Sequence, residues 1–404
     1  MNQDKIFLLK GKIQNYAWGG YDFIPRLLNV ENPDHKPVAE YWMGAHPSAS
    51  SKILVDGKEV SLNDEINKNP KVFIGEKVEQ RFGELPYLFK ILDVRELLSI
   101  QVHPSKTEAE KGFDAEEAAG ILITDKARNY KDRNHKPEVM VALSEFWLLH
   151  GFLEKEKLST VLKSVPEFET LVPVFEKESY KGLYKYVMEL PQTQVDSILQ
   201  PLVERELANN SSDKSQPGFW VRRVYEYAQT KELVNIDRGI FSIYFFNIVK
   251  ALPGEAIFQG AGIPHAYMEG QNVELMANSD NVLRGGLTPK HIDVPELLKH
   301  TKFEGVIPNV MKGELLLNHE KNYPCPVPDF GISKIELSSS ESIENTSFSA
   351  EIIIVTEGEI SFQHEDKTLT LFHGEAAFIL PETKYTIHSE TEGTAFKAFV
   401  PKID

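Results

Sequence analysis

Residues 265–290, HAYMEGQNVELMANSDNVLRGGLTPK, decide how the rest of this sequence is interpreted. The stretch is polar, lacks regular periodicity and directly follows an apolar run that ends in Gly262-Ile263-Pro264. Its metal-ligating or charged side chains are His265, Glu269, Glu274, Arg284 and Lys290. A folded protein keeps such a glycine-punctuated stretch either as a solvated loop or at a functional site. We expect it to bury little core, and its partners elsewhere in the chain favour a site.

The composition is typical of a soluble globular protein of two or three domains, with 404 residues and 41% hydrophobic content. The net charge of −16 disfavours nucleic acid or an anionic membrane as a partner. Cys325 is the only cysteine, so no disulfide can form within the chain. Because no apolar run is long enough for a signal peptide or a bilayer span, we expect a cytoplasmic protein.

Short apolar runs between turn residues predict antiparallel strands in residues 6–55, 86–95 and 330–400. Lys90 lies in the middle of the second of these runs. A lysine in this position is costly unless an anion or a wet cavity receives it, or unless it reaches water at an edge.

A polar stripe follows in residues 97–103, where Ser99, Gln101 and His103 alternate with apolar residues. Residues two apart in a strand share a face. The stripe therefore predicts either a solvent-facing side or the polar interior of a barrel.

Helical periodicity replaces strand alternation in residues 152–235, which we interpret as an insertion of several short helices. Another helix is expected within residues 106–128. Strand character returns in residues 239–249, followed by 253–258, which lead into His265.

Four candidate metal ligands follow from these patterns: Gln101, His103, Glu138 and His265. Two imidazoles, a carboxylate and an amide oxygen suit Zn²⁺ or another first-row divalent ion. Glu138 opens an apolar strand, where a carboxylate is either a ligand or a strand-end charge in water.

Residues 373–381, HGEAAFILP, echo the segment that begins at Gly254. Both lie among short strands, which favours a repeated β-barrel domain. In the second copy Lys384 and Tyr385 occupy the neighbourhood of His265, so no metal is expected there.

The chain resembles the type I phosphomannose isomerase family from residue 10 to its C-terminus. Residues 130–138, YKDRNHKPE, match the family signature Y-x-D-x-N-H-K-P-E, and residues 265–290 match its second signature. The one departure is Gly285, where alanine is usual, and we expect it to loosen the backbone after Arg284.

The resemblance implies a mainly β fold of two cupin-type jelly-roll barrels with an inserted α-helical domain. The catalytic cupin domain would comprise residues 1–151 and 236–300, the helical domain 152–235, and a C-terminal cupin domain without metal 301–404. Gln101, His103, Glu138 and His265 match the positions that hold one zinc ion.

The resemblance also implies interconversion of mannose 6-phosphate and fructose 6-phosphate, with proton transfer through an enediol. Arg284 matches the catalytic arginine of the family, and Lys90, Lys290 and Ser99 match pocket or phosphate positions. Lys136, His135 and Glu274 are candidates for the base that moves the proton. Zinc would stabilise the negative charge that develops on the sugar oxygens. We expect a monomer that binds a sugar phosphate.

Two other functions fit a cupin barrel. Iron dioxygenases use histidine and glutamate ligands, but usually as H-x-H with a nearby glutamate, whereas Glu138 is distant in sequence and surrounded by cations. A non-catalytic sugar-phosphate-binding regulator would keep the fold without turnover, but all the polar signature residues are present here.

Overall fold

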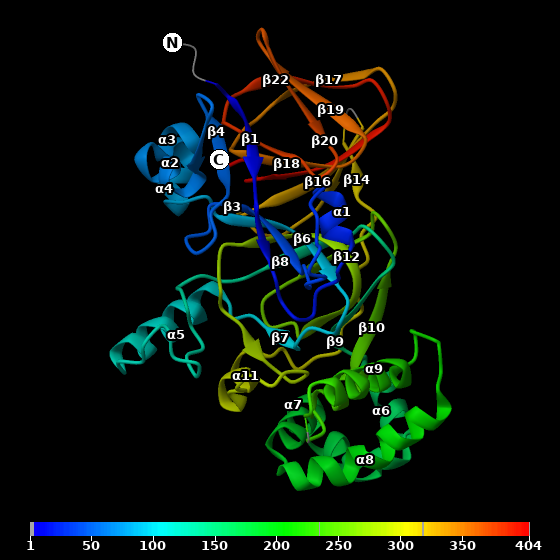
Figure 1. Cartoon of the computed structure of the whole chain (residues 1–404). Coiled ribbons are helices and arrows are strands. Elements are labelled where there is room, and N and C mark those ends of the chain that lie inside the picture. The colour runs from blue at the N-terminus through cyan, green and yellow to red at the C-terminus, as the bar shows by residue number, and fades with distance from the viewer. Residues whose placement is uncertain (1–3, 234, 317–318, 404) are drawn as a thin grey trace.

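The computed structural model describes residues 4–233, 235–316 and 319–403. Its strands, within these residues, form a ten-stranded, a nine-stranded and a four-stranded sheet. The green helices at one end of the molecule lie opposite the C-terminal strands at the other, with the ten-stranded sheet between them (Figure 1). None of the described helices is long and apolar enough to cross a membrane.

The ten-stranded sheet carries most of the predicted site residues. Its main path is β10 (Phe246–Ala251), β9 (Phe146–Phe152), β12 (His265–Ala277), β6 (Tyr87–Val94), β3 (Glu40–Gly44) and β2 (Lys12–Gln14). The strands that pair beside this path are β7 (Gln101–Val102), β8 (Glu138–Ala142), β11 (Ala256–Gln259) and β13 (Leu283–Arg284).

The nine-stranded sheet joins both ends of the chain. Its order is β14 (Glu314–Leu315), β15 (Glu320–Tyr323), β16 (Gly331–Leu337), β23 (Gly393–Phe399), β18 (Glu351–Glu357), β21 (Ala376–Ile379), β1 (Ile6–Lys10), β4 (Lys52–Val55) and β5 (Lys58–Ser61). β1 pairs with β21, so the N-terminal strand shares a sheet with strands of the predicted C-terminal domain. The predicted division into domains therefore stays a prediction.

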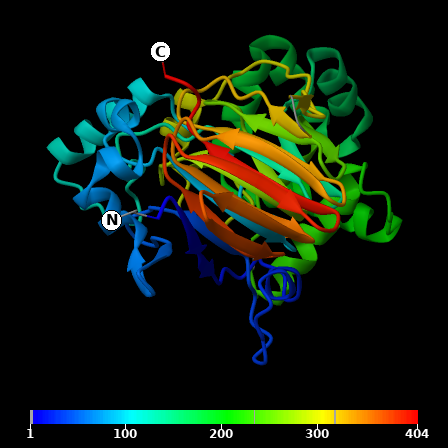
Figure 2. The same cartoon turned by 90° about the horizontal axis from the view of Figure 1, so that it is seen from above.

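The four-stranded sheet faces away from the helical end of the molecule (Figure 1). It is ordered β17 (Glu341–Thr346), β22 (Lys384–Ser389), β19 (Glu359–His364) and β20 (Lys367–Phe372). Seen from above, its strands lie in front of the helices of the opposite end (Figure 2).

The helices gather mainly in the predicted insertion. Within it lie α6 (Lys155–Ser164), the 3₁₀ helix η1 (Pro166–Leu171), α7 (Val172–Glu189), α8 (Gln192–Asn209) and α9 (Pro217–Thr230). The remaining helices are α1 (Phe23–Leu27), α2 (Leu62–Lys68), α3 (Pro70–Phe73), α4 (Glu76–Phe82), α5 (Lys106–Ala118), α10 (Gly239–Phe245) and α11 (Val294–His300). The predicted insertion is helical. Its apolar residues recur at helical spacing and pack on β9 and on the first part of β12.

The predicted strand at residues 239–249 is wrong in its first part. Residues Gly239–Phe245 form helix α10, and only Phe246–Ala251 form strand β10. Every residue of α10 is buried. A short apolar run that is buried on all sides does not reveal by its periodicity whether it is a helix or a strand.

Strand β12 buries more core than expected for a polar stretch. Val273 and Leu275 face the core between the two large sheets, where they join Ile352 and Phe396 in one hydrophobic cluster. Glu274, which alternates with them, lies on the opposite face. Both faces of β12 are buried, and one of them is partly polar. The alternation of apolar and polar residues that would predict a strand is therefore not visible in this sequence.

The two parts of β12 pair with different strands of its sheet. Its first residues pair with β9 and β7, and residues Gly270–Ala277 pair with β6 and β8. The register shifts between Tyr267 and Glu269, and Gly270 has a φ of 124°. A Cβ on Gly270 would lie 2.6 Å from the Glu145 carbonyl oxygen, so this corner requires glycine.

The sequence echo corresponds to two turns with the same hydrogen bonds. Gly254 N–H donates to the Ala142 carbonyl at 2.8 Å, and Gly374 N–H donates to the Val355 carbonyl at 2.7 Å. Each turn leads into a strand, β11 or β21, that pairs antiparallel with β8 or β18. The two glycines have φ values of 82° and 84°.

The strand β18 begins with a buried carboxylate, Glu351, as β8 begins with Glu138. Lys397 of β23 stands opposite Ile353 of β18. In the same way, Glu274 of β12 stands opposite Met140 of β8. Lys397 Nζ lies 2.9 Å from a carboxylate oxygen of Glu320. The C-terminal strands thus have an ammonium group that pairs with Glu320 and whose charge also acts on the buried Glu351.

We expect Phe89→Ala to destabilise the protein by about 3–5 kcal/mol, because Phe89 is fully buried between the two large sheets. Urea unfolding followed by circular dichroism measures this change. The matched control is Phe372→Ala, since Phe372 is 51% exposed and its loss should stay within about 0.5 kcal/mol. Equal effects of the two substitutions would contradict the assignment of this core.

Candidate active site

Three predicted ligands meet at one end of the ten-stranded sheet. His103 follows β7, Glu138 opens β8 and His265 opens β12. The Nε2 atoms of His103 and His265 lie 3.4 Å and 3.3 Å from the two carboxylate oxygens of Glu138. All three side chains are buried, and one ligand atom from each lies within 4.8 Å of the others. Among the described residues, this is the group that offers three ligands to a metal ion.

The tautomers of both imidazoles are fixed by backbone carbonyls. His103 Nδ1–H donates to the Asn281 carbonyl at 2.8 Å, and His265 Nδ1–H donates to the Ile263 carbonyl at 2.9 Å. Each Nε2 therefore carries a lone pair that points toward an anionic carboxylate. His103 Nε2 has no hydrogen-bond partner in the described part of the chain. A divalent cation between these atoms would satisfy all of them, so the residues fit a zinc ion.

The protonation states agree with this fit. Burial lowers the pKa of His103 to about 4, against the opposing charge of Glu138, so the imidazole is neutral at pH 7. Burial raises the pKa of Glu138, but Lys136 and His103 lower it by a larger amount. The pKa of this carboxyl therefore lies well below its usual range. Lys136 Nζ lies 3.3 Å from Glu138. Zinc ligation requires neutral histidine and ionised carboxylate.

The predicted fourth ligand, Gln101, is placed by strand register. It lies opposite His265 on β12 and opposite Arg284 on β13. Directly opposed residues of an antiparallel pair share a face of the sheet. Gln101 therefore presents its side chain on the face that carries His265 and Arg284.

Lys90 is buried with its charge compensated. Its Nζ lies 3.0 Å from Glu274 and 3.6 Å from Glu40, and 5.1 Å from the centre of the Trp42 ring. Burial would lower the pKa of Lys90, but Glu40 and Glu274 raise it above its ordinary value. The lysine therefore stays charged inside the molecule, and it does not reach water at an edge.

Arg284 and Lys290 are cations without an ion-pair partner among residues 4–233, 235–316 and 319–403. The acids that could have paired with Arg284 are occupied, because Asp280 lies 3.5 Å from His46 and Glu274 lies against Lys90. Burial lowers the pKa of Arg284, and burial together with Arg284 lowers that of Lys290. Two uncompensated cations that repel each other favour an anion between them.

Two predicted residues have other surroundings. His135 Nε2 lies 2.9 Å and 3.0 Å from the two carboxylate oxygens of Asp329, next to the β16 strand. Ser99 is half-buried between Leu98, which donates its N–H to Tyr267, and Ile100, which donates to Gly286. The roles of His135 and Ser99 therefore stay predictions.

Asn281 joins the two signature stretches, and sequence reasoning missed it. Its side-chain oxygen accepts from the N–H groups of Lys131 and Asp132 at 2.7 Å and 3.2 Å. Its amide nitrogen donates to the carbonyls of Asp132 and Asn134, each at 2.8 Å. Its own carbonyl orients His103. Its place in the S-D-N of the second signature was the signal available in the sequence.

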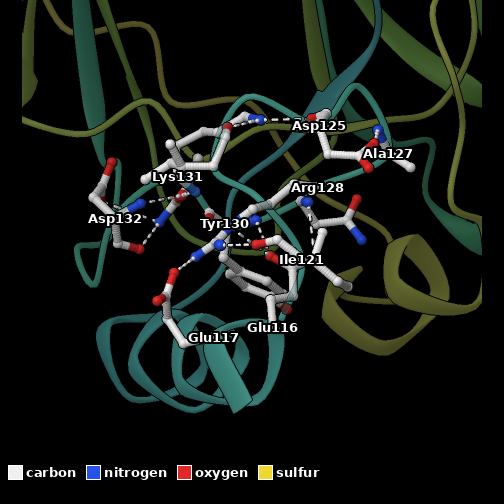
Figure 3. A network of polar contacts seen from close by, with 12 residues as sticks. Glu116, Glu117, Ile121, Asp125, Ala127, Arg128, Tyr130, Lys131 and Asp132 are labelled. Atoms are coloured by element: carbon white, nitrogen blue, oxygen red, sulfur yellow. Dashed lines mark hydrogen bonds and ion pairs between the residues drawn. The ribbon is translucent and has the colours of Figure 1, made fainter. Parts of the chain in front are cut away.

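A polar network anchors the start of the first signature stretch (Figure 3). The Glu116 carboxylate accepts from the N–H groups of Asn129 and Tyr130, each at 2.9 Å. Buried Arg128 donates to the Tyr130 carbonyl at 2.8 Å and pairs with Glu117 at 2.6 Å (Figure 3). Helix α5 thereby fixes the chain that leads to Lys136 and Glu138.

Two further polar residues lie beside the metal ligands. His150 stands opposite His265, and Gln259 stands opposite Glu138. His150 Nδ1–H donates to the Gln259 side-chain oxygen at 2.7 Å, and both residues are buried. Only the strand register brings them here, so no local pattern in the sequence indicates their position.

Comparisons with known proteins agree with this geometry. Residues 6–155 match the family model described as phosphomannose isomerase type I, catalytic domain. The mannose-6-phosphate isomerase of Salmonella typhimurium is 41% identical over 378 residues, which cover 92% of this chain and 94% of that protein. The human mannose-6-phosphate isomerase is 35% identical over 369 residues, 84% of each chain. A crystal structure of the Salmonella typhimurium enzyme with substrate and zinc has a TM-score of 0.87 at 36% identity, covering 98% of this chain and 100% of that one.

We expect Asn281→Asp to weaken zinc binding by about 10–100-fold, because a carboxylate cannot donate to Asp132 and Asn134 and would displace the carbonyl that orients His103. Competition with a chelating dye measures the affinity. Asn63→Asp, on the first turn of α2 and outside this network, is the matched control. Unchanged zinc affinity in Asn281→Asp would contradict the role of Asn281.

Proposed function

This chain belongs to the type I phosphomannose isomerase family, and we propose that it interconverts mannose 6-phosphate and fructose 6-phosphate at the centre formed by His103, Glu138 and His265. The observation that carries this proposal is the pair of Nε2 lone pairs directed at one carboxylate, 3.4 Å and 3.3 Å away. We propose Gln101 as the fourth ligand of one zinc ion. When bound, zinc polarises sugar oxygens and stabilises negative charge that develops on them.

The chain's own residues supply the remaining requirements of an aldose–ketose isomerase. Arg284 and Lys290 are free to bind an anionic group, which supports contact with a phosphate or a developing enediolate. We assign Arg284 to the reacting part of the sugar, because it stands opposite Gln101 in the same sheet. Lys290 and Ser99 then bind the phosphate.

Proton transfer between C1 and C2 requires a base near the sugar. Lys136 lies 3.3 Å from the ligand Glu138, and Glu274 shares its strand face with Met276, which is opposite Glu138. Burial raises the pKa of Glu274, while Lys90 opposes the shift. His135 is held by Asp329. We therefore propose Lys136 or Glu274 as the base, with Lys90 fixing Glu274.

We further propose that the two halves of the sheet system are cupin-type jelly rolls. The recurring glycine turn and the paired strands β8–β11 and β18–β21 support an internal repeat. The proposed domains are the catalytic one at residues 1–151 and 236–300, the helical one at 152–235, and the C-terminal one at 301–404. β1 would then be an exchanged strand that fastens the first domain to the last.

We expect one zinc per chain, and we expect a chelator to abolish turnover in a coupled assay with mannose 6-phosphate. His103→Ala should lose zinc and activity but keep its circular dichroism spectrum, since the core lies elsewhere. His388→Ala, an exposed histidine paired with Glu390, is the control. Two tightly bound zinc ions, or iron with oxygen uptake, would overturn the assignment of one zinc isomerase centre. Sugar binding without turnover would instead favour a regulator.

Arg284→Ala should lower kcat and kcat/KM together by about a few kcal/mol of transition-state stabilisation. Arg284→Lys should recover only part, because an ammonium cannot make a two-pronged contact. Steady-state kinetics measure both, with Arg26→Ala, an exposed arginine of α1, as the control. A raised KM with intact kcat would reassign Arg284 to phosphate binding, and a lowered Tm with normal kcat would make it a structural residue.

A further inference from the structure

The loop that follows Arg284 is fastened to the junction between the helical insertion and α10. One carboxylate oxygen of Asp237 accepts from the N–H groups of Gly239 and Leu287 at 2.7 Å and 2.8 Å, and the other accepts from Thr288 N–H at 2.8 Å. Hydrogen bonds to an ionised acceptor are stronger than neutral ones. A single side chain therefore holds two successive N–H groups of this loop.

The loop backbone needs such support. Leu287 has a φ of 56° and Gly286 a φ of 122°, both in the left-handed region. A leucine in that region is strained and persists only where its surroundings determine it. A Cβ on Gly286 would lie 2.5 Å from the Gly239 Cα, so the start of α10 packs directly on the loop.

Helix α7 contacts the loop from a second side. A Cβ at Gly285 would lie 2.6 Å from the hydroxyl oxygen of Tyr184 and 3.1 Å from Ile100. Tyr184 is fully buried, with Phe152 and Phe246 packed against its ring. Because the ring is tightly packed, its hydroxyl group cannot move away from the loop. The hydroxyl therefore limits how closely Gly285 can approach α7.

The same loop is connected to the metal-binding strand. Gly285 N–H donates to the Ile100 carbonyl at 2.9 Å, and Ile100 N–H donates to the Gly286 carbonyl at 3.0 Å. These bonds flank the pairing of Arg284 with Gln101. A shift of the loop would move Arg284 relative to Gln101 and to the ligand His265 beyond it.

Given the proposed isomerase function, on which this assignment rests, we propose that Asp237 is a positioning residue that holds Arg284 and Lys290 in register with the metal centre. The helical insertion acts with it through Tyr184, which limits the position of Gly285. Asp237 acts through the loop, because its carboxylate accepts hydrogen bonds from the backbone of that loop and of α10.

Asp237→Ala in the zinc-loaded enzyme tests this proposal. We expect kcat/KM to fall by about tenfold to a hundredfold, since a misplacement of about 1 Å can cost a hundredfold in rate. Zinc content should stay at the wild-type level. Asp196→Ala is the matched control, because Asp196 lies in the adjacent helical insertion and its carboxylate accepts from Ile236 N–H at 3.2 Å rather than from the loop.

A double-mutant cycle separates positioning from general stability. In an Arg284→Ala background, Asp237→Ala should cost several-fold less in kcat/KM than it does in the wild type, because one of the two cations it positions is already gone. The same loss in both backgrounds would overturn the proposal, as would normal kinetics in Asp237→Ala. Absence of turnover in the wild-type enzyme would instead overturn the proposed function, so the two failures are distinguishable.

A second pair of variants keeps the test valid if Asp237→Ala folds poorly. Gly285→Ala should lower kcat/KM because its methyl group meets the Tyr184 hydroxyl. Removing that hydroxyl in the Gly285→Ala/Tyr184→Phe double variant should restore most of the activity, while Tyr184→Phe alone stays near wild type. Full activity of Gly285→Ala, or no rescue in the double variant, would overturn the contribution of the helical insertion.

Discussion

The corner that β12 makes at Gly270 is the constraint on which the site depends. A side chain there would collide with the Glu145 backbone, so the strand can bend only at a glycine. Before the corner, β12 places His265 opposite Gln101. After the corner, it places Glu274 opposite Lys90 and Met276 opposite Glu138. One continuous strand therefore supplies a candidate metal ligand to one half of the sheet and a buried, charge-paired carboxylate to the other.

The two candidate histidine ligands are oriented by backbone groups. Both imidazoles are oriented by carbonyl oxygens, and Asn281 fixes one of those carbonyls while it binds the stretch that leads to Lys136. A carbonyl accepts hydrogen bonds and never donates them, so it selects one tautomer without a titratable partner.

Much of the architecture and of the candidate site could be predicted from the sequence, because most of the informative residues lie in three short stretches, 97–103, 130–138 and 265–290. The helical insertion followed from its periodicity, and the group of His103, Glu138 and His265 followed from residue type. The helix at Gly239–Phe245 could not be predicted, since an apolar run buried on all sides lacks a periodic signal. Gly285 was expected to loosen the backbone, but the hydroxyl group of Tyr184 lies directly against Gly285. Tyr184 is more than a hundred residues earlier in the chain. Contacts of this kind, like the pairing of β1 with β21, depend on tertiary packing that no local pattern encodes.

The ammonium group of Lys397 distinguishes the C-terminal half of the proposed repeat from the half that contains the candidate zinc site. In one half, the proposed zinc is an exchangeable component, so the stability it contributes depends on the free metal concentration around the protein. In the other half, the cation near Glu320 and Glu351 is covalently part of the chain and cannot be withdrawn by a chelator. The charge balance of the C-terminal half therefore does not depend on the supply of metal, whereas that of the half with the proposed zinc does.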